Sequence, residues 1–161
     1  EHYVEKADAL QSAIRLGKIA INRSHSDFPG MQVLNTILGG YFGSRLMANI
    51  REDKGYTYGI GSALVSMKNA GYFFIASEVG ADVCTSALTE IQKEIEILKT
   101  ETVSEQELGL VRNYMLGSML IGKGWRRLLL VRRIRNIVLN RIIRINGLED
   151  YVLRSRINQD S

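Results

Sequence analysis

The amino-acid sequence predicts an α+β fold, a mostly antiparallel sheet covered on one face by helices. Three observations predict this class. Segments typical of strands and helices follow one another in the order strand, two helices, two strands, two helices. The two neighbouring strands are joined by a short polar turn, which favours antiparallel pairing. The chain has 161 residues, the length of one ordinary domain with enough mass for a core.

The first strand is expected over residues 12–22, where β-branched residues alternate loosely with polar ones. Asp27 is a candidate N-cap for a helix over residues 28–38. The only proline, Pro29, stands in the first turn of this helix, where a missing N–H is harmless. The glycine pair at 39–40 is expected to close the helix and, with Gly43, to let two helices approach closely.

A second helix is expected over residues 43–54, ending at Gly55, because a helix C-terminus favours a residue that tolerates positive φ. Strand formers follow, and they predict strands over residues 56–66 and 71–79. The polar residues 68–69 between them predict a hairpin turn.

Helical periodicity is clearest in the next part of the chain. Apolar residues recur there at intervals of three and four, which predicts one buried stripe: Cys84, Leu88, Ile91, Ile95 and Leu98. Four charged residues between them are expected to face water: Glu90, Lys93, Glu94 and Glu96. Ser104 and Glu107 form a capping box, which predicts that a last helix begins there.

Charge divides the chain into two parts. Residues 1–121 hold 11 Lys and Arg against 14 Asp and Glu, a net charge of −3, whereas residues 122–161 hold 10 against 3, a net charge of +7. We therefore expect a domain over residues 1–121 and an atypical basic, Arg-rich tail over residues 122–161. No apolar run is long enough to predict a transmembrane segment. The lone Cys84 excludes an internal disulfide.

Arg51 and Tyr58 are the residues most informative about function. Arg51 is expected on the last turn of the second helix, and Tyr58, seven residues later, at the start of the following strand. A guanidinium and a phenol presented from rigid elements can bind a peptide carbonyl, a carboxylate or a developing oxyanion. Taken singly, Arg51 could instead be a cation at a helix C-terminus, where it interacts favourably with the helix dipole. Tyr58 taken singly could be a half-buried strand aromatic.

The stretches around this pair carry a family resemblance: LNTILGG at 34–40, GSRL at 43–46 and IREDKGYTY at 50–58. They resemble the second, non-catalytic domain of the pitrilysin and insulin-degrading-enzyme family of zinc peptidases. This family includes the mitochondrial processing peptidase and many bacterial zinc proteases. The resemblance runs from about residue 9 to about residue 121, roughly the first three quarters of the chain.

The resemblance implies that the chain is the zinc-free half of a pitrilysin-type metallopeptidase. Arg51 and Tyr58 would bind the peptide substrate, and a partner domain with a His-x-x-Glu-His motif, fused upstream or a separate subunit, would supply the zinc. A different function within the same fold is a non-proteolytic partner subunit. The bacterial cytoplasm and periplasm are the compartments that we expect.

The chain itself is not expected to hold a zinc ion or any other cofactor. Catalytic zinc needs three protein ligands and an open position. His2 and His25 are the two histidines, and neither belongs to a His-x-x-Glu-His motif.

The basic tail leaves two interpretations open. Residues 123–146 contain eight cations and no acidic residue. They could form a basic amphipathic helix that binds an anionic membrane or nucleic acid. Alternatively, the reading frame slips near Gly122, and the abrupt change to arginine usage favours this second interpretation. Binding of nucleic acid is not expected, because the body is acidic and only Trp125 adds an aromatic residue to the cations.

Overall fold

The structure, a computed structural model, describes residues 10–121. The chain divides into two compact units, residues 1–94 and residues 95–161, which are described in turn. The order of elements is the predicted one: a strand, two helical segments, two strands and two long helices. The α+β class is therefore confirmed. The basic tail, and with it both interpretations of residues 122–161, lies outside the described residues.

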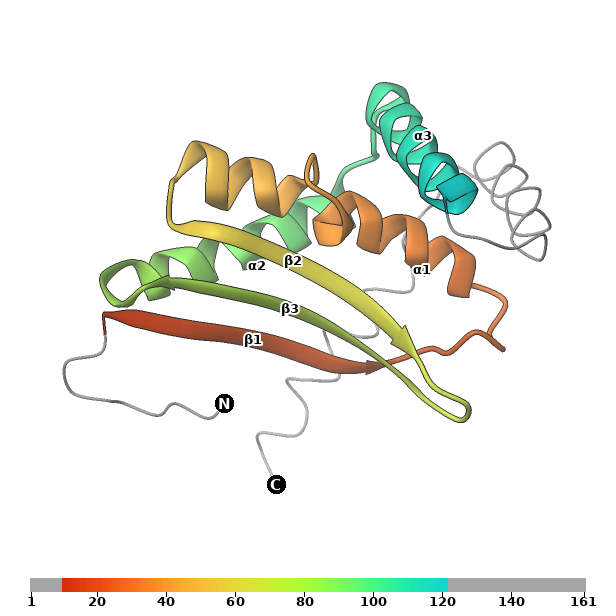
Figure 1. The fold of residues 1–161 in the computed structure, drawn as a ribbon, viewed down its shortest axis with the longest axis horizontal. Coiled ribbons are helices and arrows are strands. Elements are labelled where there is room, and N and C mark those ends of the chain that lie inside the picture. The colour runs from red at the N-terminus through yellow and green to blue at the C-terminus, as the bar shows by residue number, and fades with distance from the viewer. Residues whose placement is uncertain (1–9, 122–161) are drawn as a thin grey trace. The chain divides into compact units, whose positions relative to one another are not determined.

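A three-stranded antiparallel sheet forms the base of the first unit (Figure 1). Its strands are β1 (Gln11–Ala20), β2 (Thr57–Ser66) and β3 (Gly71–Gly80), arranged in the order β1-β3-β2. The hairpin between β2 and β3 is closed by the Met67 N–H, which donates to the Ala70 carbonyl over 2.8 Å. This is the predicted turn. The central position of β3 means that its side chains meet those of both other strands.

Side chains alternate between the two faces of the sheet, as they must in β structure. On β3 the alternate residues Ile75, Ser77 and Val79 are buried, while Glu78 between them is exposed. Ile14 of β1 and Ile60 of β2 are opposite Ser77, and both are buried as well. The sheet thus has a core face, which includes these buried residues, and an open face, which includes Glu78.

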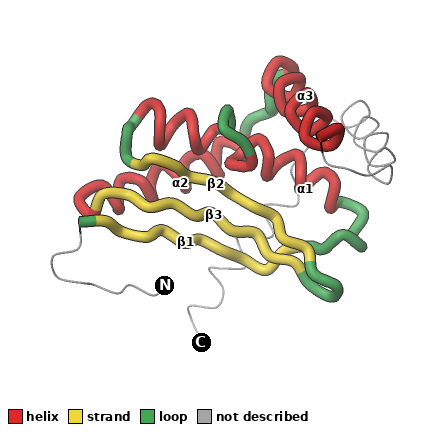
Figure 2. The backbone as a smooth tube through the Cα atoms, in the orientation of Figure 1, coloured by secondary structure: helices red, strands yellow, loops and turns green. Residues whose placement is uncertain are grey.

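Helices cover the core face (Figures 1 and 2). The first helical segment begins as α1 (Phe28–Asn35) and continues as the π-helical η1 (Thr36–Gly40). The second segment is the π-helical η2 (Met47–Asp53). Both segments contact β2, and they bury apolar side chains against it: Phe28, Val33, Leu34, Ile37, Leu38, Leu46 and Ile50. Burial of these side chains is the main force that holds helices and sheet together.

The glycine pair at 39–40 ends the first helical segment, as predicted, because η1 ends at Gly40. Gly39 also lies close to two neighbouring elements. A Cβ atom on Gly39 would lie 2.7 Å from the backbone nitrogen of Ser62 and 3.0 Å from a methyl group of Leu46. The close approach that Gly39 permits is therefore to strand β2 as much as to the second helical segment.

Gly55 ends the second helical segment as predicted. Its φ is +65°, in the left-handed region that glycine adopts without steric cost. The turn at Gly55 lets the Tyr56 N–H donate to the Ile50 carbonyl over 3.0 Å, which satisfies a carbonyl at the end of the helix. The chain then enters β2 directly, so η2 and the start of β2 have a fixed relation to each other.

The helix α2 (Cys84–Thr100) begins in the first unit after the short 3₁₀ turn η3 (Ala81–Val83). Its buried stripe includes Ile91, as predicted, and also Ala87. Glu90 and Glu94 were expected to face water, which is wrong for both. Each is half-buried and accepts a hydrogen bond from the amide of Asn49 in η2, over 3.0 and 2.7 Å.

The second unit contains the end of α2 and the helix α3 (Glu105–Ile121). Leu98 and Val111 are its fully buried apolar residues among those described. The Glu107 N–H donates to the Ser104 hydroxyl over 3.2 Å, so this half of the predicted capping box is present. Within residues 10–121, no helix is both long and apolar enough to cross a membrane.

Candidate functional site

Tyr58 is presented to solvent by a β-bulge at the start of β2. Thr57 pairs with Val79 and Ile60 pairs with Ser77, so Tyr58 and Gly59 together are opposite the single residue Glu78. A bulge of this kind turns a side chain away from the regular alternation. Tyr58 is 93% exposed, so its interpretation as a half-buried strand aromatic is wrong.

Two hydroxyl groups hold the bulge in place. The Thr57 Oγ1 lies 2.6 Å from the Glu78 carbonyl oxygen and accepts from the Gly59 N–H over 3.1 Å. The Ser77 hydroxyl lies 3.0 Å from both the Thr57 Oγ1 and the Gly59 carbonyl oxygen. Ser77 is only 4% exposed and its two bonds are part-buried, whereas the other bonds of the Thr57 hydroxyl are exposed. The backbone beneath Tyr58 is therefore fixed.

A shallow cavity of about 280 Å³ lies beside Tyr58, mainly over the open face of the sheet. All three strands contribute to its lining, which includes Gln11, Arg15, Tyr58, Gly59, Ala76 and Glu78. The lining combines the small residues Gly59 and Ala76 with several polar side chains. The cavity thus offers a ligand several hydrogen-bonding groups next to an exposed aromatic ring.

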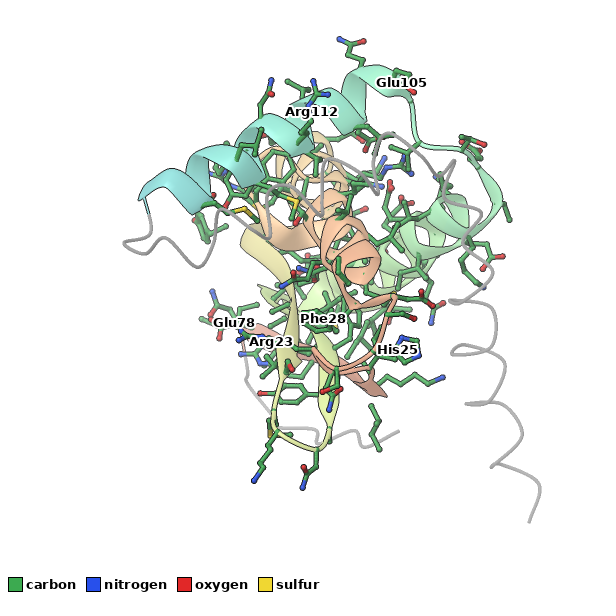
Figure 3. The ribbon with its side chains drawn as sticks, turned by 90° about the vertical axis from the view of Figure 1, so that its right-hand side faces the viewer. Arg23, His25, Phe28, Glu78, Glu105 and Arg112 are labelled. Atoms are coloured by element: carbon green, nitrogen blue, oxygen red, sulfur yellow. The ribbon has the colours of Figure 1, made fainter. Side chains whose placement is uncertain are left out.

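Arg15 and Glu78 form an ion pair in this cavity. The Arg15 Nη2 donates to the Glu78 Oε1 over 3.3 Å. The Arg15 Nη1 also donates to two backbone carbonyls, those of Ile14 over 2.8 Å and Ser77 over 2.9 Å. Glu78 projects outward from the sheet, whereas Phe28 lies on the side of the core (Figure 3). The guanidinium of Arg15 is therefore held in place by two strands.

Arg51 lies in the last turn of η2, as predicted. Its guanidinium carbon is 4.7 Å from the centroid of the Phe42 ring, a cation–π contact. Phe42 is 64% exposed, and such contacts at exposed sites contribute roughly 0.5–1 kcal/mol. In the part of the chain that the structure describes, neither the Arg51 guanidinium nor the Tyr58 hydroxyl makes a hydrogen bond. Both groups keep their hydrogen-bonding capacity for a ligand.

Tyr58 is exposed and Arg51 is half-buried, and the two side chains make no direct contact. Tyr58 lines the cavity and Arg51 does not. The structure instead places Arg15 and Glu78 beside Tyr58. Sequence reasoning missed these two residues because they are 63 positions apart and meet only through the register of β1 with β3. Alternation along β1 was the one signal that could have placed Arg15 on an exposed face.

The helical segment that carries Arg51 is fastened to α2 through Asn49. The Asn49 amide donates to the Glu90 and Glu94 carboxylates. The hydrogen bond from Asn49 lowers the pKa of Glu90 below its ordinary value of 4.5, and the nearby Lys93 and Lys54 add to this effect. The arrangement favours the ionised carboxylate at neutral pH and limits the movement of η2.

The described residues offer no group of three His, Cys, Asp or Glu side chains that could hold a metal ion. His25 is exposed and lies in the turn before α1, where its Nδ1 accepts from the Asp27 N–H over 3.1 Å. His2 lies outside the described residues.

Known proteins with similar sequences are bacterial zinc proteases and related proteins. The chain is 30% identical over 121 residues to the zinc protease YmxG of Bacillus subtilis, described as uncharacterized, and the match covers 75% of this chain and 30% of YmxG. It is 26% identical over 118 residues to a second B. subtilis protein, described as the probable inactive metalloprotease YmfF, covering 70% of this chain and 27% of YmfF. The chain therefore spans about 30% of the length of the curated relatives that it matches.

A solved structure has the same fold. The peptidase M16 inactive domain from Pseudomonas fluorescens superposes with a TM-score of 0.66 at 26% identity, covering 92% of this chain and 35% of that chain. The family model described as the peptidase M16 inactive domain matches residues 1–115. This match confirms the resemblance that the residues around Arg51 and Tyr58 indicated. Sequence, fold and relatives thus agree that the chain belongs to the family of peptidase M16 inactive domains.

Proposed function

We propose that this chain is the zinc-free half of a metallopeptidase, which holds a peptide substrate while a zinc-bearing partner domain hydrolyses it. The observation that carries the proposal is the presentation of Tyr58, an aromatic residue that is 93% exposed on a bulge fixed by two hydroxyl groups. Exposing a tyrosine in this way forgoes the stabilisation that its burial would give. A ligand that covers the ring would recover it.

Two donors would act on the backbone of the substrate. The Tyr58 hydroxyl and the Arg51 guanidinium donate to peptide oxygens, including a carbonyl oxygen that gains negative charge during hydrolysis. Arg51 gives up only a weak contact with Phe42 when it turns to a ligand. The zinc ion of the partner domain would supply the activated water. The chain's own contribution is therefore to bind and orient.

The pairing of two halves is itself part of the proposal. The chain spans about 30% of the length of YmxG and 35% of the M16 chain from P. fluorescens. Both of those proteins are long enough to contain further domains. A zinc-bearing domain, fused or separate, is the partner that the proposed reaction requires.

The test is the peptidase activity of this chain reconstituted with a zinc-bearing half. Arg51→Ala and Tyr58→Phe should each lower kcat/KM by at least about a hundredfold, because one donor to a developing oxyanion typically contributes roughly 3–4 kcal/mol. The matched controls are Arg23→Ala and Tyr114→Phe. Arg23 is exposed, and Tyr114 is an exposed tyrosine of α3. Both controls should stay within a few-fold of the wild type.

A substrate-binding role is excluded if Arg51→Ala and Tyr58→Phe retain wild-type activity while the free energy of unfolding is unchanged. The second candidate, a non-proteolytic partner subunit, is favoured by the similarity to YmfF, which is described as inactive. The same assay separates the two functions. A non-proteolytic subunit would give no peptidase activity with any zinc-bearing half, even in its wild-type form.

A further inference from the structure

The cavity beside Tyr58 carries two opposite charges whose hydrogen-bonding capacity is only partly used. Both N–H groups on the Arg15 Nη1 are engaged, by the carbonyls of Ile14 and Ser77. The Arg15 Nη2 has one acceptor, the Glu78 Oε1. A guanidinium has five N–H groups, so Nε–H and one N–H on Nη2 have no acceptor among the described residues. The second carboxylate oxygen of Glu78 likewise has no donor there.

These open positions lie next to each other on the same side of the sheet. Arg15 is opposite Ala76, and Glu78 is the next residue of β3 on that face. Arg15 is fixed by strand carbonyls, and the bulge fixes Tyr58 opposite Glu78. A ligand in the cavity therefore meets a donor from Arg15, an acceptor from Glu78 and the hydroxyl of Tyr58 in a fixed arrangement.

The presence of both charges limits the kinds of chemical group that the cavity can bind. A carboxylate would be attracted by Arg15 and repelled by Glu78. An ammonium group would be repelled by Arg15 and attracted by Glu78. The two effects are similar in size because the two side chains are in contact and are exposed to a similar degree, 55% and 64%. An uncharged group that carries an acceptor and a donor side by side satisfies both residues. The amide of a peptide backbone is such a group.

We propose that this cavity is a subsite for one backbone amide of the bound peptide. Arg15 donates to its carbonyl oxygen, Glu78 accepts from its N–H, and the Tyr58 ring packs beside it. The subsite recognises the backbone and disfavours a charged side chain of either sign at that position of the peptide. This inference rests on the proposed function, since it requires that the chain binds peptides.

The experiment is a titration of the full chain with fluorescent peptides at low ionic strength. The peptides have blocked ends and an uncharged sequence, and a single Glu or Lys is moved through each position in turn. For the wild type, one position should disfavour both charges relative to Gln. In Glu78→Gln, the peptide with Glu at that position should bind about threefold more tightly than the one with Lys. In Arg15→Gln, the preference should reverse by a similar factor, which is small because exposed ion pairs are weak.

Control variants change the net charge equally, away from the cavity. Glu101→Gln and Arg23→Gln replace exposed residues and should leave the position-specific preference as it is in the wild type. Arg15→Lys keeps the positive charge and should keep the wild-type preference even if it weakens binding. N-methylation of the peptide at the sensitive position should lower affinity for the wild type, because it removes the N–H that Glu78 accepts.

The inference is wrong if Glu78→Gln and Glu101→Gln give the same preferences, or if the change in preference is spread evenly over all peptide positions. In that case loss of turnover in Tyr58→Phe would still support the proposed function. If the wild-type chain binds none of the peptides, the subsite is excluded. Turnover by the reconstituted pair that is insensitive to Arg51 and Tyr58 would then exclude the proposed function as well.

Discussion

Asn49 links two charged residues of one helix to the helical segment that carries Arg51. Its amide donates to Glu90 over 3.0 Å and to Glu94 over 2.7 Å. A carboxylate that accepts a hydrogen bond in the folded state, and loses it on unfolding, is easier to ionise when folded. The pKa of Glu90 is accordingly lowered, first by the Asn49 hydrogen bond and further by Lys93 and Lys54. Folding and ionisation of Glu90 therefore support each other.

This coupling predicts a loss of stability in acid. Because the pKa of Glu90 is lower in the folded state, its contribution is complete above the ordinary value of 4.5 and is lost as the pH falls through the lowered pKa. The free energy of unfolding should therefore decrease below about pH 4.5, and less steeply in Glu90→Gln than in the wild type. Urea denaturation at a series of pH values measures both slopes.

Asn49→Ala serves as the matched variant, because it keeps the carboxylate and removes its main hydrogen-bond donor. Its acid-dependent loss should also be shallower than that of the wild type. Equal slopes in the wild type and both variants would show that the Asn49–Glu90 bond does not contribute to stability.

The bulge at the start of β2 is the element that shapes the candidate site. Thr57 and Ser77 hold two residues of β2 opposite one residue of β3, and this places Tyr58 on the surface. Without the bonds made by the Thr57 hydroxyl, the Gly59 N–H would lose its partner. This bond is exposed, so its loss costs what a typical hydrogen bond contributes, about 0.5–1.5 kcal/mol. The position of Tyr58 therefore depends on a hydroxyl group and not on packing of its own ring.

Thr57→Val tests this dependence, because valine keeps the branched shape and removes the hydroxyl. We expect the free energy of unfolding to decrease by about 0.5–1.5 kcal/mol. Peptide binding should weaken as well, since Tyr58 is no longer held in one place. The control is Thr85→Val at an exposed position of α2, where substitutions usually change stability by less than about 0.5 kcal/mol. A Thr57→Val variant that is as stable as the control, and binds peptides normally, would contradict the role of the hydroxyl.

Local sequence signals predicted the elements and their order well. Gly55 ended the second helix, the polar turn joined β2 to β3, and Ser104 began the last helix, because each of these features depends on neighbouring residues. The π-helical form of η1 and η2 was missed, since residues that favour an α-helix also suit this wider helix. The close approach of Gly39 to the second helical segment was predicted, but its contact with Ser62 was not, because that contact depends on the packing of a helix on a strand.

The site was predicted less completely than the fold. Arg51 and Tyr58 were selected through the family resemblance, and both lie where the sequence predicts, at a helix end and a strand start. The groups around Tyr58 come from β1 and β3, and only the strand register brings them together. Likewise, Asn49 and Glu90 are 41 positions apart in the sequence. Contacts of this range have no signal in a single sequence.

At the scale of the whole molecule, the open face of the sheet supports the proposal of a partner half. Ile19 is 79% exposed and Tyr72 is 40% exposed, and both lie on the face that the helices of residues 10–94 leave uncovered. Exposed apolar side chains that lie together often mark a surface that another protein covers. The cavity beside Tyr58 opens mainly on the same face. A substrate held there would therefore lie between this chain and whatever covers that face.

Zinc and the partner half should affect this chain differently. The residues described here offer no cluster of ligands for a metal ion, so we expect added zinc to leave its unfolding temperature unchanged. A zinc-bearing half that binds the folded chain should raise the free energy of unfolding, by about 2.7 kcal/mol at a concentration a hundredfold above its Kd. Thermal unfolding of the chain with zinc alone, with the zinc-bearing half, and with the same half stripped of zinc measures each effect.

The stripped half separates pairing from metal binding. If two surfaces hold the halves together, the zinc-free partner should stabilise this chain as much as the loaded one does, because the proposal places the metal within the partner and not between the two. A chain that binds zinc at a ratio of one to one would contradict the assignment of the metal to the partner. A chain whose stability is the same with and without the partner at high concentration would contradict the pairing, and with it the proposal that the peptide is held between two halves.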